Sequence, residues 1–293
     1  MNTGNSDRFA VFILTHGRPN KVKTYDTLRR QGYTGDVYII IDNEDKTADE
    51  YHKRFGDKVI VFDKAAIAQT FDVGDNFTRG GVIYARHAAP RIAQDLGLDY
   101  FLELDDDYGE FRYVFASNLS FTRLKVKNLD RLFMTILDYY RAIPALSIAM
   151  AQGGDIPGGA NCTNLTRLWL KRKVMNTFFR SIHRPFSFLG RMNEDVNTYV
   201  TLGNRGGLFL TFFNTAINQD ATQQTSGGMT EIYRDTGTYI KSFYTIMHAP
   251  SCVKIYQTGY SHPRIHHLID YSRAVPRILS EQYRKASTPR LMT

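Results

Sequence analysis

The first third of the chain alternates between short apolar runs and segments with helical spacing, and this alternation constrains the fold most strongly. Runs of strand length cover Phe9–Thr15, Val37–Ile41, 58–63 and 99–105. Between them, residues 22–29, 46–56 and 82–96 space apolar side chains three and four apart, as amphipathic helices do. Buried strands separated by helices indicate a largely parallel sheet covered on both faces. The sequence therefore predicts an α/β fold that binds its ligands beyond the carboxyl ends of the strands.

The second half of the chain is less regular. Residues 128–142 are expected to form a helix, residues 145–151 a strand and residues 238–256 further strands, and a basic helix is expected after Tyr271. No convincing linker interrupts the chain. We therefore expect a single domain.

Net charge and cysteine content narrow the classes of partner. The 293 residues include 37 Lys and Arg against 29 Asp and Glu, a formal charge of +8. This excess favours polyanionic partners, either nucleic acid or phosphate-bearing small molecules. Cys162 and Cys252 match neither a disulfide framework nor a zinc site. No apolar run approaches the ~20 residues of a membrane span, and the N-terminus lacks a signal peptide, so we expect a cytoplasmic protein without a membrane partner.

Residues 100–111, YFLELDDDYGEF, lead an apolar strand directly into Asp105, Asp106 and Asp107. Neighbouring carboxylates repel one another by roughly 1 kcal/mol per pair even in water, so a positive group is expected beside them. Asp105 and Asp107 are two apart and point the same way in an extended segment. Their oxygens suit Mg2+ or Mn2+, which also binds substrate phosphates. The alternative is a solvated loop whose aspartates cap a helix or turn.

Other residues near strand ends are candidates for holding a nucleotide. Thr15, His16 and Arg18 follow the first strand, and Arg offers the better fork for a phosphate. The alternative for them is an ordinary turn. Asp42 ends the second strand and either accepts ribose or base hydrogen bonds or caps the next helix. Arg86, in the helix before the aspartate strand, either leans toward a diphosphate or is a surface charge.

The second half supplies an acidic pair and a histidine cluster. Glu194 and Asp195 follow a Gly-Arg turn, and such a pair can supply a general base for an acceptor hydroxyl. Acids at a helix N-terminus are the alternative. His262 lies with His266 and His267 near Arg264, and one histidine of this group can complete a metal site. A surface loop is the commoner outcome for clustered histidines.

A basic and aromatic stretch, RLWLKRKVMNTFFRSIHRPF, covers Arg167–Phe186. Interleaved cations and rings suit a phosphate backbone with a base stacked on a ring. The alternative is a solvated charged face. The residues expected to contact DNA are Lys171, Arg172, Lys173 and Arg184.

These features together resemble a known family. A nucleotide-binding α/β half, a strand ending in D-x-D and a later Glu-Asp pair resemble a GT-A glycosyltransferase. The stretches FILTHGRPNKVKTYDTLRRQGYTGDVYIIIDNEDKTADEY, KVIVFDK, ARHAA and YFLELDDDY resemble the TET-associated glycosyltransferases of bacteriophages. That family transfers a sugar from a nucleotide sugar to hydroxymethylated pyrimidines in phage DNA.

The resemblance implies a GT-A-like mixed, mostly parallel sheet flanked by helices, in a single domain over residues 1–285 with a tail at 286–293. Within it, residues 8–115 are the expected nucleotide-sugar-binding half and residues 116–285 the expected acceptor-side half, and the single domain is expected to carry a smaller acceptor-side lobe. The expected contacts to the nucleotide sugar are Thr15, His16, Arg18, Asp42, Arg86 and Asp106. The expected metal ligands are Asp105, Asp107 and His262, and the expected base is Asp195 beside Glu194.

The implied reaction moves a sugar, most plausibly glucose from UDP-glucose, onto 5-hydroxymethylcytosine or a related base in double-stranded DNA. The reaction would use Mn2+ or Mg2+ as a cofactor. It would take place in the cytoplasm of the host cell if a phage encodes the protein. The donor sugar, the stereochemical outcome and the oligomeric state stay open. Three alternatives also stay open: a GT-A enzyme acting on a glycan, lipid or protein, a nucleotidyltransferase, and a non-catalytic DNA-binding protein.

Overall fold

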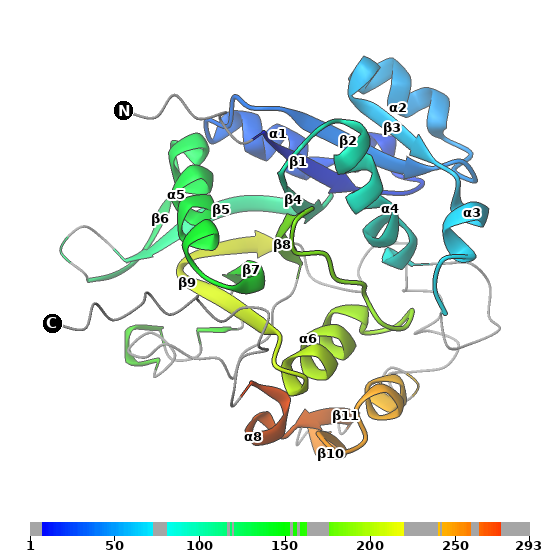
Figure 1. The fold of residues 1–293 in the computed structure, drawn as a ribbon. Helices are drawn as coiled ribbons and strands as arrows, with labels where there is room; N and C mark the ends of the chain where they lie inside the picture. Colours follow the sequence, from blue (N-terminus) through cyan, green and yellow to red (C-terminus); the bar gives the residue numbers. More distant parts are fainter. Residues whose placement is uncertain are drawn as a thin grey trace, which may run out of the picture.

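The computed structural model describes residues 8–72, 81–115, 118, 120–152, 155–156, 159–162, 176–219, 240, 242–258 and 264–276. These residues form a nine-stranded sheet with helices on both sides and a separate two-stranded sheet (Figure 1). No helix in the described part of the chain is long and apolar enough to cross a membrane.

The N-terminal strands build the parallel part of the large sheet. They are β1 (Phe9–Leu14), β2 (Val37–Asp42), β3 (Val59–Phe62) and β4 (Tyr100–Asp105), and they lie in the order β3-β2-β1-β4. β1 pairs in parallel with both β2 and β4, so Leu14 lies opposite Ile40 on one side and opposite Asp105 on the other. The carboxyl ends of these strands therefore meet at one edge, as the sequence predicts.

Strand direction changes beside β4, where β8 (Thr177–Ser181) pairs antiparallel to it. The sheet continues in the order β8-β7-β9-β5-β6. The remaining strands are β5 (Tyr108–Phe115), β6 (Phe121–Lys125), β7 (Ala145–Gln152) and β9 (Leu208–Gln219). β7 and β9 are parallel, whereas β5 pairs antiparallel with β9 and β6. The structure confirms the expected mixed α/β sheet flanked by helices. The division into two halves at residue 115 stays a prediction.

Helices cover both faces of this sheet, each over its own buried apolar cluster (Figure 1). One face is covered by α1 (Lys23–Arg30), α2 (Ala48–Phe55) and α5 (Leu129–Ala142), the other by α4 (Ile83–Asp95) and α6 (Glu194–Asn204). Along β4, Leu102 and Leu104 face the first cluster and Phe101 faces the second. Because side chains alternate along a strand, Glu103 and Asp105 lie on the face covered by α4 and α6.

One prediction in the second half is wrong. Residues 242–248 are helical, although the sequence suggests strands there. The buried positions Ser242, Thr245 and Ala249 recur three and four apart, which is the period of a helix. Strand pairing begins only at β10 (Val253–Thr258), which forms a hairpin with β11 (Arg264–Ile269).

Shorter helices complete the described fold. They are α3 (Lys64–Ala68) after β3 and α8 (Tyr271–Ala274) after β11. Figure 1 places β10, β11 and α8 beyond α6, away from β1 and β2. The tail after residue 276, where a basic helix is expected, lies outside the described residues.

Candidate active site

The aspartate turn is held by Thr24 in the first turn of α1. β4 ends at Asp105, Asp106 and Asp107 form the turn, and Tyr108 begins β5. Thr24 is buried and donates its backbone N–H to the Asp106 carbonyl (3.1 Å) and its hydroxyl to the Asp105 carbonyl (2.6 Å). The same hydroxyl accepts from the Tyr108 N–H (2.9 Å). The backbone of the turn is thereby fixed, so its three carboxylates are presented in fixed directions.

The middle carboxylate connects the turn to the loop after β1. Thr15 donates its hydroxyl to Asp106 Oδ2 (2.6 Å), and Arg18 Nη2 lies 3.0 Å from Asp106 Oδ1. The Asp106 side chain is 3% exposed. Tyr51 adds a third contact, because its hydroxyl lies 2.9 Å from Thr15 Oγ1. This geometry favours a structural role for Asp106, and its expected contact with a nucleotide sugar stays a prediction.

The outer carboxylates lack comparable protein partners. Burial raises the pKa of Asp105 to about 7, opposed by Arg86 at 3.8 Å and reinforced by the charge of Asp107. Burial and the neighbouring Asp106 raise the pKa of Asp107 to about 6. Asp107 Oδ1 is buried without a hydrogen-bond partner among the described residues, and Oδ2 accepts only a long contact from Gln219 Nε2 (3.5 Å). The turn therefore gathers three carboxylates whose negative charge Arg18 and Arg86 neutralise only in part.

Oxygen ligands of this kind suit a hard divalent cation, which would neutralise these carboxylates. The chain alone supplies few ligands. Within the described ranges, no group of three or more His, Cys, Asp or Glu side chains is placed to hold a metal ion. His262, the expected third ligand, lies outside the described residues. Asp105 and Asp107 stay the predicted protein ligands, and other oxygens must complete the coordination.

Mn2+ should raise the melting temperature of the protein more at about pH 8 than at about pH 5.5. The pKa values of about 7 and about 6 mean that folded Asp105 and Asp107 hold protons which the unfolded chain loses near pH 4. Without a cation, the two carboxyl groups therefore lower the free energy of unfolding as the pH rises from about 4 to about 7. A cation that displaces the protons binds more tightly at the higher pH.

Thermal melts with and without Mn2+ at both pH values test this expectation. At a hundredfold excess over Kd, the shift near pH 8 should be about 5 °C or more. Asp107→Asn should remove most of the pH dependence. Equal shifts at both pH values in the wild-type protein would contradict the assignment of these carboxylates.

A second polar group lies at the ends of β1 and β2. His16 Nδ1 lies 2.7 Å from Asp42 Oδ2, and this hydrogen bond raises the pKa of His16. Lys64 Nζ lies 3.3 Å from Asp42 Oδ1. Burial raises the pKa of Asp42, but the hydrogen bond from His16 and the charges of His16 and Lys64 leave it below its usual value. Lys64 is not among the predicted site residues, because its only signal in the sequence is its position just after β3 at the same sheet edge.

The third group joins α4, β4 and α6. Arg86 is 3% exposed, so the alternative of a surface charge is wrong. Its Nη1 lies 2.9 Å from Glu194 Oε1, and its Nη2 lies 3.8 Å from Asp105 Oδ1. Asp195 is buried, and its Oδ1 accepts from the Val196 N–H (2.7 Å). The structure thus brings the D-x-D turn and the acidic pair of the second half close together through one arginine.

The expected DNA contacts are only partly visible. Lys171, Arg172 and Lys173 lie outside the described residues. Arg184 stacks over the Tyr140 ring at 3.9 Å and donates to the carbonyls of Tyr140, Ile143 and Ala145 at 3.0, 2.6 and 2.8 Å. These contacts close the C-terminus of α5 and favour a structural role for Arg184. Its contact with DNA stays a prediction.

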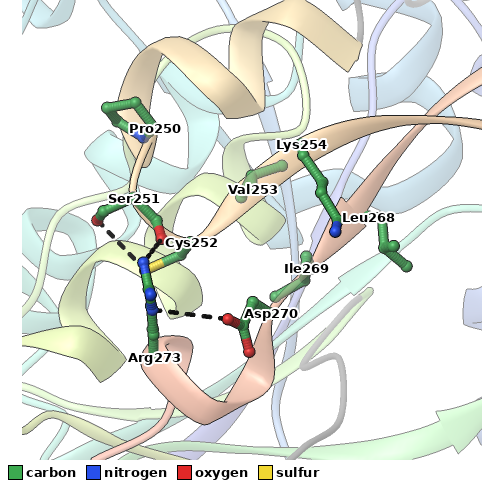
Figure 2. Close-up of a pocket in the computed structure, with 9 residues that line it drawn as sticks. All are labelled: Pro250, Ser251, Cys252, Val253, Lys254, Leu268, Ile269, Asp270 and Arg273. Atoms are coloured by element: carbon green, nitrogen blue, oxygen red, sulfur yellow. Dashed lines mark hydrogen bonds and ion pairs between the residues drawn. The ribbon is translucent and has the colours of Figure 1, made fainter.

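A cavity of about 510 Å³ lies beside the β10–β11 hairpin (Figure 2). In this cavity the Arg273 guanidinium donates to the Ser251 carbonyl (3.2 Å) and approaches Asp270 (3.6 Å). None of the predicted site residues lines it. The candidate active site is therefore the set of polar and charged residues at the ends of β1, β2 and β4.

Comparisons with known proteins agree with the family suggested by the sequence. The model of a family described as TET-Associated Glycosyltransferase matches residues 9–228, well over half of the chain. No curated protein matches.

Solved structures show a distant similarity. One is glucosyl-3-phosphoglycerate synthase from Mycobacterium tuberculosis with Mn2+, UDP and phosphoglyceric acid, at 8% identity and a TM-score of 0.47, covering 90% of this chain and 87% of that one. Another is a mannosyltransferase from Pyrobaculum calidifontis with GDP-Man and Mn2+, at 10% identity and a TM-score of 0.48, covering 84% and 73%.

Proposed function

Because the chain belongs to the TET-associated glycosyltransferase family, we propose that it transfers a sugar from a nucleotide sugar to a hydroxymethylated pyrimidine in DNA. The observation that carries this proposal is the family match together with the carboxylates at the carboxyl ends of β2 and β4, beside Thr15, His16 and Arg18 after β1. Ligands of open α/β sheets bind at this edge. We propose glucose from UDP-glucose as the donor and 5-hydroxymethylcytosine as the acceptor base.

The donor contacts follow from the first two polar groups. Arg18 Nη2 is already at Asp106, and its side chain keeps 28% exposure, so its remaining N–H groups can reach a phosphate. His16 is half exposed beside Asp42, and this pair can bind the base or the ribose of the nucleotide. Thr15 holds the loop that carries both side chains through its hydrogen bond to Asp106.

Asp105 and Asp107 fit the binding of a divalent cation. The buried Asp107 Oδ1 has no hydrogen-bond partner among the described residues, and both carboxyl pKa values are raised by burial. A bound Mn2+ or Mg2+ would neutralise the negative charge that develops on the leaving diphosphate. Without it, two carboxylates would repel the diphosphate.

The acceptor side requires a base that takes the proton from the hydroxymethyl oxygen. Glu194 is ion-paired with Arg86 through Oε1 (2.9 Å), so one of its oxygens is already engaged by the protein. We therefore assign the base to Asp195 and propose an inverting displacement at the anomeric carbon. A base in a duplex is stacked, so the protein must flip it out to reach it. The formal charge of +8 favours DNA as the partner.

Mass spectrometry of nucleosides tests the proposal. DNA that contains 5-hydroxymethylcytosine is incubated with the protein and UDP-glucose, with and without Mn2+, and is then digested to nucleosides. A glucosylated nucleoside that forms only with Mn2+ supports the proposal, and DNA with unmodified cytosine is the control. In a parallel incubation with a nucleoside triphosphate in place of UDP-glucose, release of pyrophosphate would indicate a nucleotidyltransferase. UDP release that requires a glycan or protein instead of DNA would indicate another acceptor, and no turnover of any nucleotide sugar would contradict the enzyme.

A further inference from the structure

The Arg86 guanidinium packs against two aromatic rings. Its central carbon lies 4.7 Å from the ring centroid of Phe178 on β8 and 4.9 Å from that of Phe188, in the segment before α6. Both rings are buried, and Arg86 itself is 3% exposed. The two rings contact each other nearly at right angles, with centroids 5.0 Å apart and an interplanar angle of 84°, and the guanidinium packs against the corner they form. These contacts restrain the orientation of the guanidinium. The direction of its N–H groups is therefore set by the protein.

Two carboxylates with separate expected roles face this guanidinium. Glu194 Oε1 lies 2.9 Å from Nη1, and Asp105 Oδ1 lies 3.8 Å from Nη2. Glu194 begins α6, whereas Asp105 ends β4, 89 positions earlier in the sequence. Glu103 and Asp195 also contribute negative charge at Arg86. The buried Arg86 guanidinium therefore faces carboxylates of both the predicted metal-binding strand and the predicted acceptor-side helix.

The backbone of Arg86 is also held, through a proline. Pro90 lies inside α4 and has no N–H, so the Arg86 carbonyl lacks the usual helical donor four residues later. Arg180 Nη1 donates to that carbonyl instead (2.9 Å) and also pairs with Glu103 Oε1 (2.5 Å). Glu103 and Asp105 lie on the same face of β4. A second buried ion pair therefore fixes the position of α4 relative to the strand that carries Asp105.

We propose that Arg86 is a positioning residue that holds Asp105 and Glu194 in their relative places, and that it does not bind the donor diphosphate. The inference rests on the proposed function. A diphosphate cannot reach a side chain that is 3% exposed without displacing the groups around it. The charge and the fixed orientation of the Arg86 guanidinium hold Asp105 on the donor side and Glu194 on the acceptor side of the site.

Substitution of Arg86 separates positioning from donor binding. Arg86→Lys keeps the charge but loses the planar guanidinium that packs against the two rings, and Arg86→Gln loses the charge as well. Each should lower kcat by about 100-fold, the typical effect of a misplacement of about 1 Å, with the KM for UDP-glucose nearly unchanged. Mn2+ affinity in the presence of UDP, measured by electron paramagnetic resonance, should fall, because Asp105 is displaced. UDP affinity without metal, measured by calorimetry, should not change.

Arg91→Lys is the matched control on the same helix, because Arg91 is exposed and pairs with the exposed Asp95 four residues later. It should leave all four measurements unchanged. A loss of UDP affinity without metal in Arg86→Lys would show that Arg86 binds the diphosphate and would overturn the proposal. An unchanged kcat and unchanged Mn2+ affinity would overturn it as well.

If the Arg86 variants do not fold, Phe188→Leu provides an alternative test of the same proposal. It removes one wall of the guanidinium site and keeps every charge, so kcat and Mn2+ affinity should fall in the same direction by a smaller factor. Normal values in folded Phe188→Leu would contradict positioning. If the wild-type protein transfers no sugar to hydroxymethylated DNA, the proposed function fails, and the Mn2+ and UDP measurements still decide the role of Arg86.

Discussion

Asp107→Asn should lower sugar transfer by at least 10²–10³-fold, the usual cost of removing one group that stabilises transition-state charge. Asn matches Asp in shape, and Asp107 Oδ1 has no hydrogen-bond partner in the described protein, so the substitution removes charge with little effect on packing. Initial rates with saturating UDP-glucose and Mn2+ measure the loss. The Kd for DNA at a fixed salt concentration should be nearly unchanged, because the proposed role of Asp107 is at the donor and not at the DNA.

Asp63→Asn is the control for this experiment. Asp63 also follows a strand at the same sheet edge, but its side chain accepts from the Ala66 N–H (2.9 Å) and caps α3. Because Asn caps helices about as well as Asp, its substitution should cost little stability and leave the transfer rate unchanged. Full activity of Asp107→Asn would refute the role of Asp107 as a metal ligand.

Asp195→Asn should lower transfer by about 10²–10⁴-fold, the contribution expected from a general base. An amide cannot take the proton of the hydroxymethyl group, although its oxygen can still accept from the Val196 N–H as the carboxylate does. Binding of UDP-glucose should be retained, because the proposed donor contacts lie at the ends of β1, β2 and β4. Single-turnover transfer and donor binding by calorimetry measure the two effects separately.

Glu194→Gln distinguishes the two acids of this pair. If Glu194 acts mainly through its ion pair with Arg86, its variant should lose less activity than Asp195→Asn and should weaken Mn2+ binding, as the Arg86 variants do. The reverse order of losses would move the base to Glu194. Wild-type turnover in both variants would indicate a retaining reaction that needs no such base.

The parallel half of the fold could be predicted because its signals are local. Each of β1, β2 and β4 is a continuous apolar run with a polar residue at its end, and parallel strands bring those ends to one edge. The sequence therefore indicated that Thr15, Asp42 and Asp105 lie near one another. Hydrogen bonds and ion pairs now link Thr15 with Asp106 and His16 with Asp42.

Other features of the site depend on contacts that no local pattern encodes. Thr24 holds the aspartate turn from α1, about eighty positions earlier, and reads in the sequence as one more polar helix residue. Arg86 is buried against aromatic rings from β8 and the following segment. The amphipathic pattern of its own helix does not reveal this burial. Arg184 closes α5 through three carbonyls, although its basic neighbourhood suggested DNA. Each of these roles is set by tertiary packing.

The tie between Asp106 and the β1 loop affects how inactive variants should be interpreted. Alanine scanning that scores only lost product would group all three adjacent aspartates together. Loss of Asp106 frees Thr15 and Arg18, so its variant should be inactive through a displaced loop and should melt at a lower temperature. Melting curves recorded beside activity would separate this folding defect from the chemical defects of its two neighbours.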